Sequence, residues 1–130
     1  MKILVGYDGS KAAEDALVLA KKHAKAFNAE LNIMTSLMQS STLNESDIEK
    51  AENKLEMLQK SVEDENIECE IHTNVSYQSP GEDLVQFAND NEIDEIVIGV
   101  RRRSKVGKMV FGSTAQYVIL TASCPVLSIK

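Results

Sequence analysis

The stretch EIVIGVRRRSKVGKMVFGSTAQ, residues 95–116, joins an apolar segment to a basic segment that is interrupted by glycines. It contains every arginine of the chain, and from residue 99 onward it has no acidic residue, although the formal net charge of the chain is −6. An apolar strand, a glycine-containing loop and then a helix is the pattern of a parallel α/β sheet, in which the helix N-terminus can bind an anion. The basic run taken alone equally fits a solvated loop or a nucleic-acid contact.

Strands and helices are predicted to alternate along the whole chain. Five short segments have the apolar character of strands: 2–7, 30–36, 68–75, 95–100 and 125–129. Segment 68–75 alternates polar and apolar residues, as an edge strand with one wet face does. Segments 2–7 and 95–100 are continuous apolar runs, as expected of strands that are covered on both faces.

Capping signals mark the helices between these strands. We expect Ser10 to cap the first helix and Ser46 to form a capping box with Glu49 at the second. Ser79 and Glu82 form another box, and a last helix is expected over about 113–122. The apolar face of the first helix is predicted to carry Ala13, Ala16, Leu17, Ala20, Ala24 and Phe27.

This alternation predicts an α/β fold, an open five-stranded parallel sheet with helices on both faces, as one domain over residues 1–130. Ligands of such sheets bind beyond the carboxyl ends of the strands, where the strand order reverses. We expect strands 2–7 and 95–100 to flank that point. The carboxyl end of strand 2–7 places Tyr7, Asp8, Gly9 and Ser10 on one side of that point. The carboxyl end of strand 95–100 places residues 99–102, with Arg101 and Arg102, on the other side.

Composition excludes several classes of protein. No apolar run approaches the ~18 residues of a membrane span, and the start MKILVGYDGS does not have the pattern of a signal peptide. The two cysteines, Cys69 and Cys124, suit a reduced cytoplasmic protein and are expected to be small buried residues. All 20 acidic residues lie outside 99–116, and no aromatic side chains interleave the basic ones, so a small anion fits better than DNA or RNA.

The residues Gly112, Ser113 and Thr114 open the last predicted helix. Its free N–H groups and the two hydroxyls could hold phosphate oxygens, although a plain Gly-Ser helix cap explains the same residues. A Walker A loop is excluded, because Gly107-Lys108 is followed by Met109. The pattern G-x-G-x-x-G is also absent.

Over essentially its whole length the chain resembles the universal stress protein family. Members that bind nucleotides carry G-x2-G-x9-G-S/T after the fourth strand, and here Gly99, Gly112 and Ser113 match at the correct spacing. The opening VGYDGS and the terminal SCPVLSI are similar as well. One position differs: Arg102 stands where the second glycine belongs, where its side chain either obstructs the phosphates or adds a guanidinium contact.

The resemblance implies an adenine nucleotide alpha hydrolase-like sheet with strand order 3-2-1-4-5, and ATP or AMP, with or without Mg, as ligand. Asp8 would reach the ribose or the metal, although Asp before Gly9 is also a common turn. The base and sugar would lie against Met34, Thr35, Ile98 and Gly99. Gly112, Ser113 and Thr114 would take the phosphates.

Two functional classes remain open. One is a nucleotide-binding stress-response module, and the other is a nucleotide-free interaction protein whose dimer surface is the functional part. An ATP-hydrolysing enzyme is disfavoured, because no Walker lysine and no clear water-activating base are present, and we predict no catalytic residue. The uncovered terminal strand and the resemblance predict a homodimer with Val126, Leu127 and Ile129 near its axis.

Overall fold

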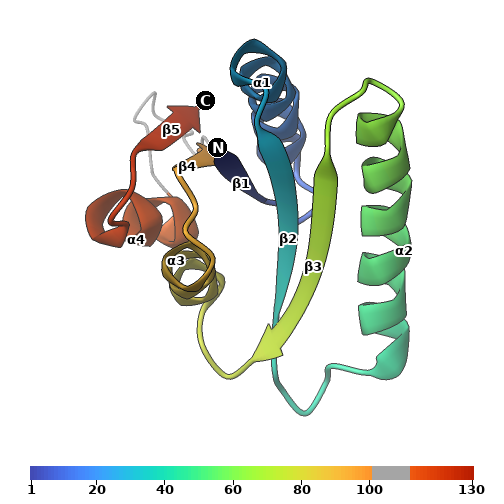
Figure 1. The fold of residues 1–130 in the computed structure, drawn as a ribbon. Coiled ribbons are helices and arrows are strands. Elements are labelled where there is room, and N and C mark those ends of the chain that lie inside the picture. Colours follow the sequence, from blue (N-terminus) through green and yellow to red (C-terminus); the bar gives the residue numbers. More distant parts are fainter. Residues whose placement is uncertain (101–111) are drawn as a thin grey trace.

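The computed structural model describes residues 1–100 and 112–130 and contains an alternating series of strands and helices (Figure 1). In chain order the elements are β1 (Lys2–Gly6), α1 (Lys11–Phe27), β2 (Glu30–Met38), α2 (Glu45–Glu63), β3 (Cys69–Ser76), α3 (Pro80–Asp90), β4 (Glu95–Gly99), α4 (Ser113–Thr121) and β5 (Val126–Ile129). Residues 101–111 of the basic segment, with Arg101 and Arg102, lie outside the described residues.

The strands form one parallel sheet in the order β3-β2-β1-β4-β5, which confirms the predicted fold class and strand order. β1 is central, with Gly6 opposite Met34 of β2 and Val5 opposite Val97 of β4. The pairing of β2 with β3 continues to Met38, beyond the end of β1. The carboxyl ends of β1, β2 and β4 therefore border one shared space, at the point where the chain connections run to opposite sides.

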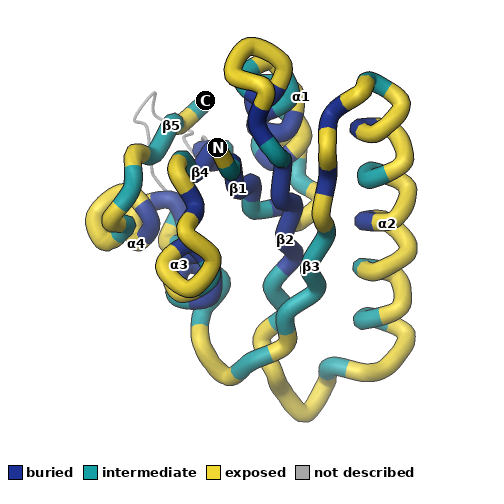
Figure 2. Tube along the Cα trace, in the orientation of Figure 1, coloured by how far each residue is buried: buried dark blue, intermediate teal, exposed yellow. Residues whose placement is uncertain are grey.

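Helices cover both faces of the sheet (Figure 1). Successive strand residues point to opposite faces, so that Ile3 and Val5 pack with α1 and α2. Leu4 belongs to the second core, with α3 and α4. Figure 2 shows burial concentrated in the strands and on the inner sides of the helices, while the outer side of α2 is exposed.

The helix N-termini confirm two predicted caps and correct one. Ser10 and Ser79 cap α1 and α3 through their side chains, as expected. The second helix begins at Glu45, two residues earlier than predicted, and its capping box pairs Asn44 with Asp47 rather than Ser46 with Glu49. Asparagine is as good an N-cap as serine, so two overlapping boxes compete at this point and the earlier one forms.

Several side chains differ from their expected burial. Phe27, the last residue of α1, is 57% exposed, because the helix ends there and the chain turns through Asn28 at φ 52°. Cys69 is buried but Cys124 is only half-buried, and both are free thiols. The side chain of His72 on β3 is half-buried, with its Nε2 3.0 Å from Asn32 Oδ1. Within residues 1–100 and 112–130, no helix is both long and apolar enough to cross a membrane.

Candidate functional site

A cavity of about 420 Å³ lies at the carboxyl ends of β1, β2 and β4, bordered by the starts of α1, α3 and α4. Its described lining consists of Gly6, Tyr7, Asp8, Ser10, Ala13, Met34, Ser36, Pro80, Leu84, Ile98, Gly99, Gly112, Ser113, Thr114 and Ala115. Cavities of this size commonly accommodate small ligands. Its place in the sheet is the one where α/β folds of this type bind them.

Most of the residues predicted from the sequence meet in this cavity. Those that line it are Tyr7, Asp8, Ser10, Met34, Ile98, Gly99, Gly112, Ser113 and Thr114. Gly9 and Thr35 are not among the lining residues. Arg101 and Arg102 lie outside the described residues.

A tight turn after β1 shapes the side of the cavity at α1. Asp8 Oδ1 accepts a hydrogen bond of 2.9 Å from the Ser10 N–H, and Gly9 has φ +82°, a left-handed conformation that favours glycine. Ser10 Oγ then accepts from the Ala13 N–H at 3.1 Å and caps α1. These bonds explain Asp8, Gly9 and Ser10 as turn and cap residues, and they hold Asp8 and Ser10 in the cavity wall.

The ends of β1 and β2 are joined by two short hydrogen bonds. The Thr35 hydroxyl donates to the Tyr7 carbonyl and the Tyr7 N–H donates to the Met34 carbonyl, each at 2.8 Å. Thr35 therefore links the two strand ends without lining the cavity, whereas Met34 lines it. Burial, with smaller contributions from the negative charges of Glu14 and Asp8, raises the pKa of the Tyr7 phenol. A phenol at its ordinary pKa of 10.0 is already protonated at neutral pH, and this shift moves its ionisation to still higher pH.

Gly99, the first glycine of the sequence motif, has a structural reason to be glycine. A Cβ atom built there would lie 2.2 Å from the carbonyl oxygen and 2.8 Å from the Cβ of Ala12, at the start of α1. Real Cβ atoms do not approach a backbone oxygen so closely, so β4 and α1 can pack together only because residue 99 has no side chain. The close packing also brings the end of β4 into the cavity wall.

The N-terminus of α4 differs from those of the other described helices. Gly112 is its N-cap and supplies no side-chain cap hydrogen bond, whereas Ser10, Asn44 and Ser79 cap α1, α2 and α3. A Cβ built at Gly112 would meet nothing within 4 Å of described protein. The first amides of a helix need an acceptor. Here they open at the cavity, where an anion would supply one and would also be stabilised by the helix dipole.

Sequence reasoning missed six lining residues: Gly6, Ala13, Ser36, Pro80, Leu84 and Ala115. Pro80 and Leu84 come from α3, which tertiary packing brings over the cavity. Leu84 approaches so closely that a Cβ at Gly6 would lie 2.8 Å from its Cδ1. The apolar periodicity of α3 predicts a buried face but does not indicate which residues of that face overlie the site. Ala13 could have been found, since it follows the predicted cap by one turn.

Comparison with known proteins places this geometry in a family. The family model of the universal stress protein family matches residues 1–130. A universal stress protein of Thermus aquaticus is 32% identical over 98% of this chain and 97% of its own length. The chain therefore belongs to the universal stress protein family.

Solved structures agree in fold and in the length that they cover. A universal stress protein from Archaeoglobus fulgidus superposes with a TM-score of 0.89 at 36% identity, over 100% of this chain and 98% of that one. A structure of the universal stress protein from A. fulgidus in complex with dAMP gives a TM-score of 0.83 at 33% identity, with the same coverage.

Proposed function

We propose that this protein binds an adenine nucleotide, ATP or AMP, in the cavity and serves as a stress-response or signalling module. The observation that carries the proposal is the α4 N-terminus, where the N-cap residue Gly112 provides no side-chain cap and the first residues of the helix line the cavity. The family and the A. fulgidus structure in complex with dAMP support the same ligand class.

The sheet order suggests how the nucleotide lies. The phosphates belong at Gly112, Ser113 and Thr114, because helix amides and hydroxyl groups are donors suited to phosphate oxygens. Across β1, on the far side of the cavity, Met34 provides an apolar surface for the base. The ribose then lies between them, near Gly99 and Asp8. A magnesium ion that accompanies ATP would find the Asp8 carboxylate as its protein ligand.

We further propose that ATP is turned over slowly or not at all. The described cavity lining includes one carboxylate, Asp8, and its Oδ1 accepts the Ser10 amide 2.9 Å away. A carboxylate occupied in this way is a weak candidate for activating a water molecule. The bound nucleotide would act without being hydrolysed, by changing the stability of the fold or the partner proteins that the module binds.

The protein is proposed to act as a cytoplasmic homodimer, built through β5. Val126, Leu127 and Ile129 are half-buried on this edge strand, and the neighbouring α4 exposes Ile119 and Leu120, the latter by 75%. Sheet edges that carry apolar residues are usually covered by pairing. The free thiols Cys69 and Cys124 suit the reducing cytoplasm. If nucleotide were absent, this surface would be the functional part of the molecule.

Co-purification tests the proposal most cheaply. Protein purified without added nucleotide, then denatured and analysed by mass spectrometry, is expected to release ATP or AMP. Material from Gly112→Val is the matched control and should release much less, because the valine side chain projects into the space that the phosphates need. Release of no nucleotide by the wild type, together with no uptake on incubation with ATP, would favour the nucleotide-free interaction protein.

A further inference from the structure

Ser36, on β2, carries a hydroxyl group that no contact of the described chain uses. Its Oγ is buried and has no hydrogen-bond partner among the described residues, while the residue itself lines the cavity. A buried hydroxyl without a partner destabilises a fold, because it gives up its bond to water and gains none. Alanine at this position would avoid that penalty, so the serine is better explained by a ligand than by stability.

The neighbouring hydroxyl shows the contrast. Thr35 points to the other face of β2, and its Oγ1 donates to the Tyr7 carbonyl at 2.8 Å. The Thr35 hydroxyl thus has a structural role that is complete without a ligand. Among the residues that the structure describes, the Ser36 hydroxyl has no such role and no hydrogen-bond partner. Rotation about χ1 between staggered positions is therefore unopposed by a hydrogen bond.

The position of Ser36 indicates which part of a nucleotide it would meet. In the sheet order, β2 lies on one side of β1, and β4 with the following α4 lies on the other. If the phosphates lie at the α4 N-terminus, the base extends across β1 toward β2. There Met34 and Leu84, which are 2% and 3% exposed, form an apolar surface suited to a flat ring, and Ser36 supplies a polar group beside it.

We propose that the Ser36 hydroxyl hydrogen-bonds the polar edge of the base and is a specificity-determining residue of the site. This inference rests on the proposed nucleotide function and adds the group that recognises the base. A hydroxyl can donate to a ring nitrogen or accept from an amino group. Adenine offers both kinds of partner on its edges. On binding, the hydroxyl exchanges an unpaired state for a paired one.

The first test uses the protein without nucleotide. Ser36→Ala should melt at the same temperature as the wild type or higher, because it removes an unpaired oxygen. Thr35→Val, the matched control on the adjacent residue, should melt lower, because it removes a hydroxyl that bonds the Tyr7 carbonyl. A lower melting temperature for Ser36→Ala would show that its hydroxyl is already paired and would overturn the proposal.

The second test measures affinity by calorimetry with AMP and four analogues that each lack one polar group of the base. The analogues are purine riboside 5′-monophosphate, 1-deaza-AMP, 3-deaza-AMP and 7-deaza-AMP. Ser36→Ala should weaken AMP binding roughly five- to tenfold, the size of one hydrogen bond. For the analogue that lacks the bonded group, the same substitution should have almost no effect.

Ser113→Ala is the control variant at the phosphate end, and it should weaken AMP and all four analogues by one common factor. The proposal is overturned if Ser36→Ala binds AMP within about twofold of the wild type, or weakens AMP and every analogue equally. A wild type that binds neither AMP nor ATP contradicts the proposed function itself. Binding by the wild type with an unaffected Ser36→Ala contradicts only the inference about Ser36.

Discussion

Gly99 and Gly112, two glycines of the same motif, have different structural roles. At Gly99 the absent side chain permits protein to pack against protein, since Ala12 lies where a Cβ would be. At Gly112 nothing in the described chain occupies that space, and φ is −64°, a value that any residue adopts. A backbone requirement for glycine therefore applies at neither position. Contact with α1 explains Gly99, and we infer that contact with a ligand explains Gly112.

This difference predicts that the same substitution destabilises the fold at Gly99 and has little effect at Gly112. Gly99→Ala should lower the free energy of unfolding by about 1–3 kcal/mol or more, as overpacking does, because the new methyl meets the Ala12 backbone. Gly112→Ala should change it by less than about 1 kcal/mol, the scale of a helix cap. Urea unfolding followed by circular dichroism measures both. Equal destabilisation by the two variants would contradict the packing role of Gly99.

At the scale of elements, two ion pairs connect α1 to Glu65, in the turn that follows α2. Glu65 lies 2.7 Å from Lys25 and 2.9 Å from Lys21, both on α1. Hydrogen bonds from Lys25 and then Lys21 lower the pKa of Glu65 from its ordinary value of 4.5 to about 2. The carboxylate is paired only in the folded state, so its contribution is present above about pH 4.5 and is lost as the pH falls toward 2.

The variant Glu65→Gln should accordingly melt slightly below the wild type at pH 7, with the difference disappearing as the pH approaches 2. The effect is expected to be small, and smaller still in high salt, because the charges are exposed to solvent. Thermal melts at pH 7, 4 and 2 check this. A difference that grows on acidification would show that Glu65 is not stabilised by the two lysines.

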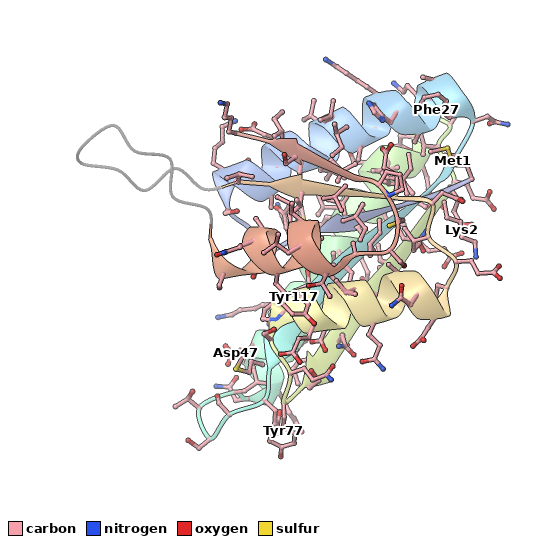
Figure 3. The ribbon with its side chains drawn as sticks, turned by 90° about the vertical axis from the view of Figure 1, so that its left-hand side faces the viewer. Met1, Lys2, Phe27, Asp47, Tyr77 and Tyr117 are labelled. Atoms are coloured by element: carbon pink, nitrogen blue, oxygen red, sulfur yellow. The ribbon has the colours of Figure 1, made fainter. Side chains whose placement is uncertain are left out.

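The helices α3 and α4, which both border the cavity, also pack against each other. A Cβ at Gly81 would lie 3.1 Å from Tyr117, which Figure 3 shows where α4 lies beside α3. Both helices contribute their first turns to the cavity lining, α3 through Pro80 and α4 through Ser113 and Thr114. A group bound between them would therefore contact two helices that already constrain each other.

The fold was largely predictable from the sequence, and the site only in part. The alternating strands and helices and the caps at Ser10 and Ser79 follow from apolar runs and short polar signals that act locally, whereas the strand order was predicted from the family resemblance. The start of α2 does not, because Asn44 and Ser46 are equally good caps and only the folded chain selects between them. Leu84 and Ser36 were not predicted to line the cavity. Whether they do so depends on how α3 packs over β2 in the folded chain, and the local sequence pattern does not determine that packing.

At the scale of the whole molecule, the edge strand β5 predicts a dimer. Light scattering at micromolar concentration should give about twice the chain mass of 14.3 kDa. Replacing Leu127 with aspartate should shift the mass toward that of one chain, because a charge would be buried at the interface. A wild type that scatters as a single chain would remove β5 as the assembly surface.

The most direct measurement is a calorimetric titration of ATP into nucleotide-free wild type and Gly112→Val, each first shown by circular dichroism to be folded. We predict a saturable isotherm for the wild type with one site per chain, and no measurable binding for Gly112→Val, whose side chain would fill the space at the α4 N-terminus. The binding should be accompanied by little or no phosphate release. Equal binding by the two proteins, or none by the wild type, would contradict the claim that this helix terminus is a phosphate site.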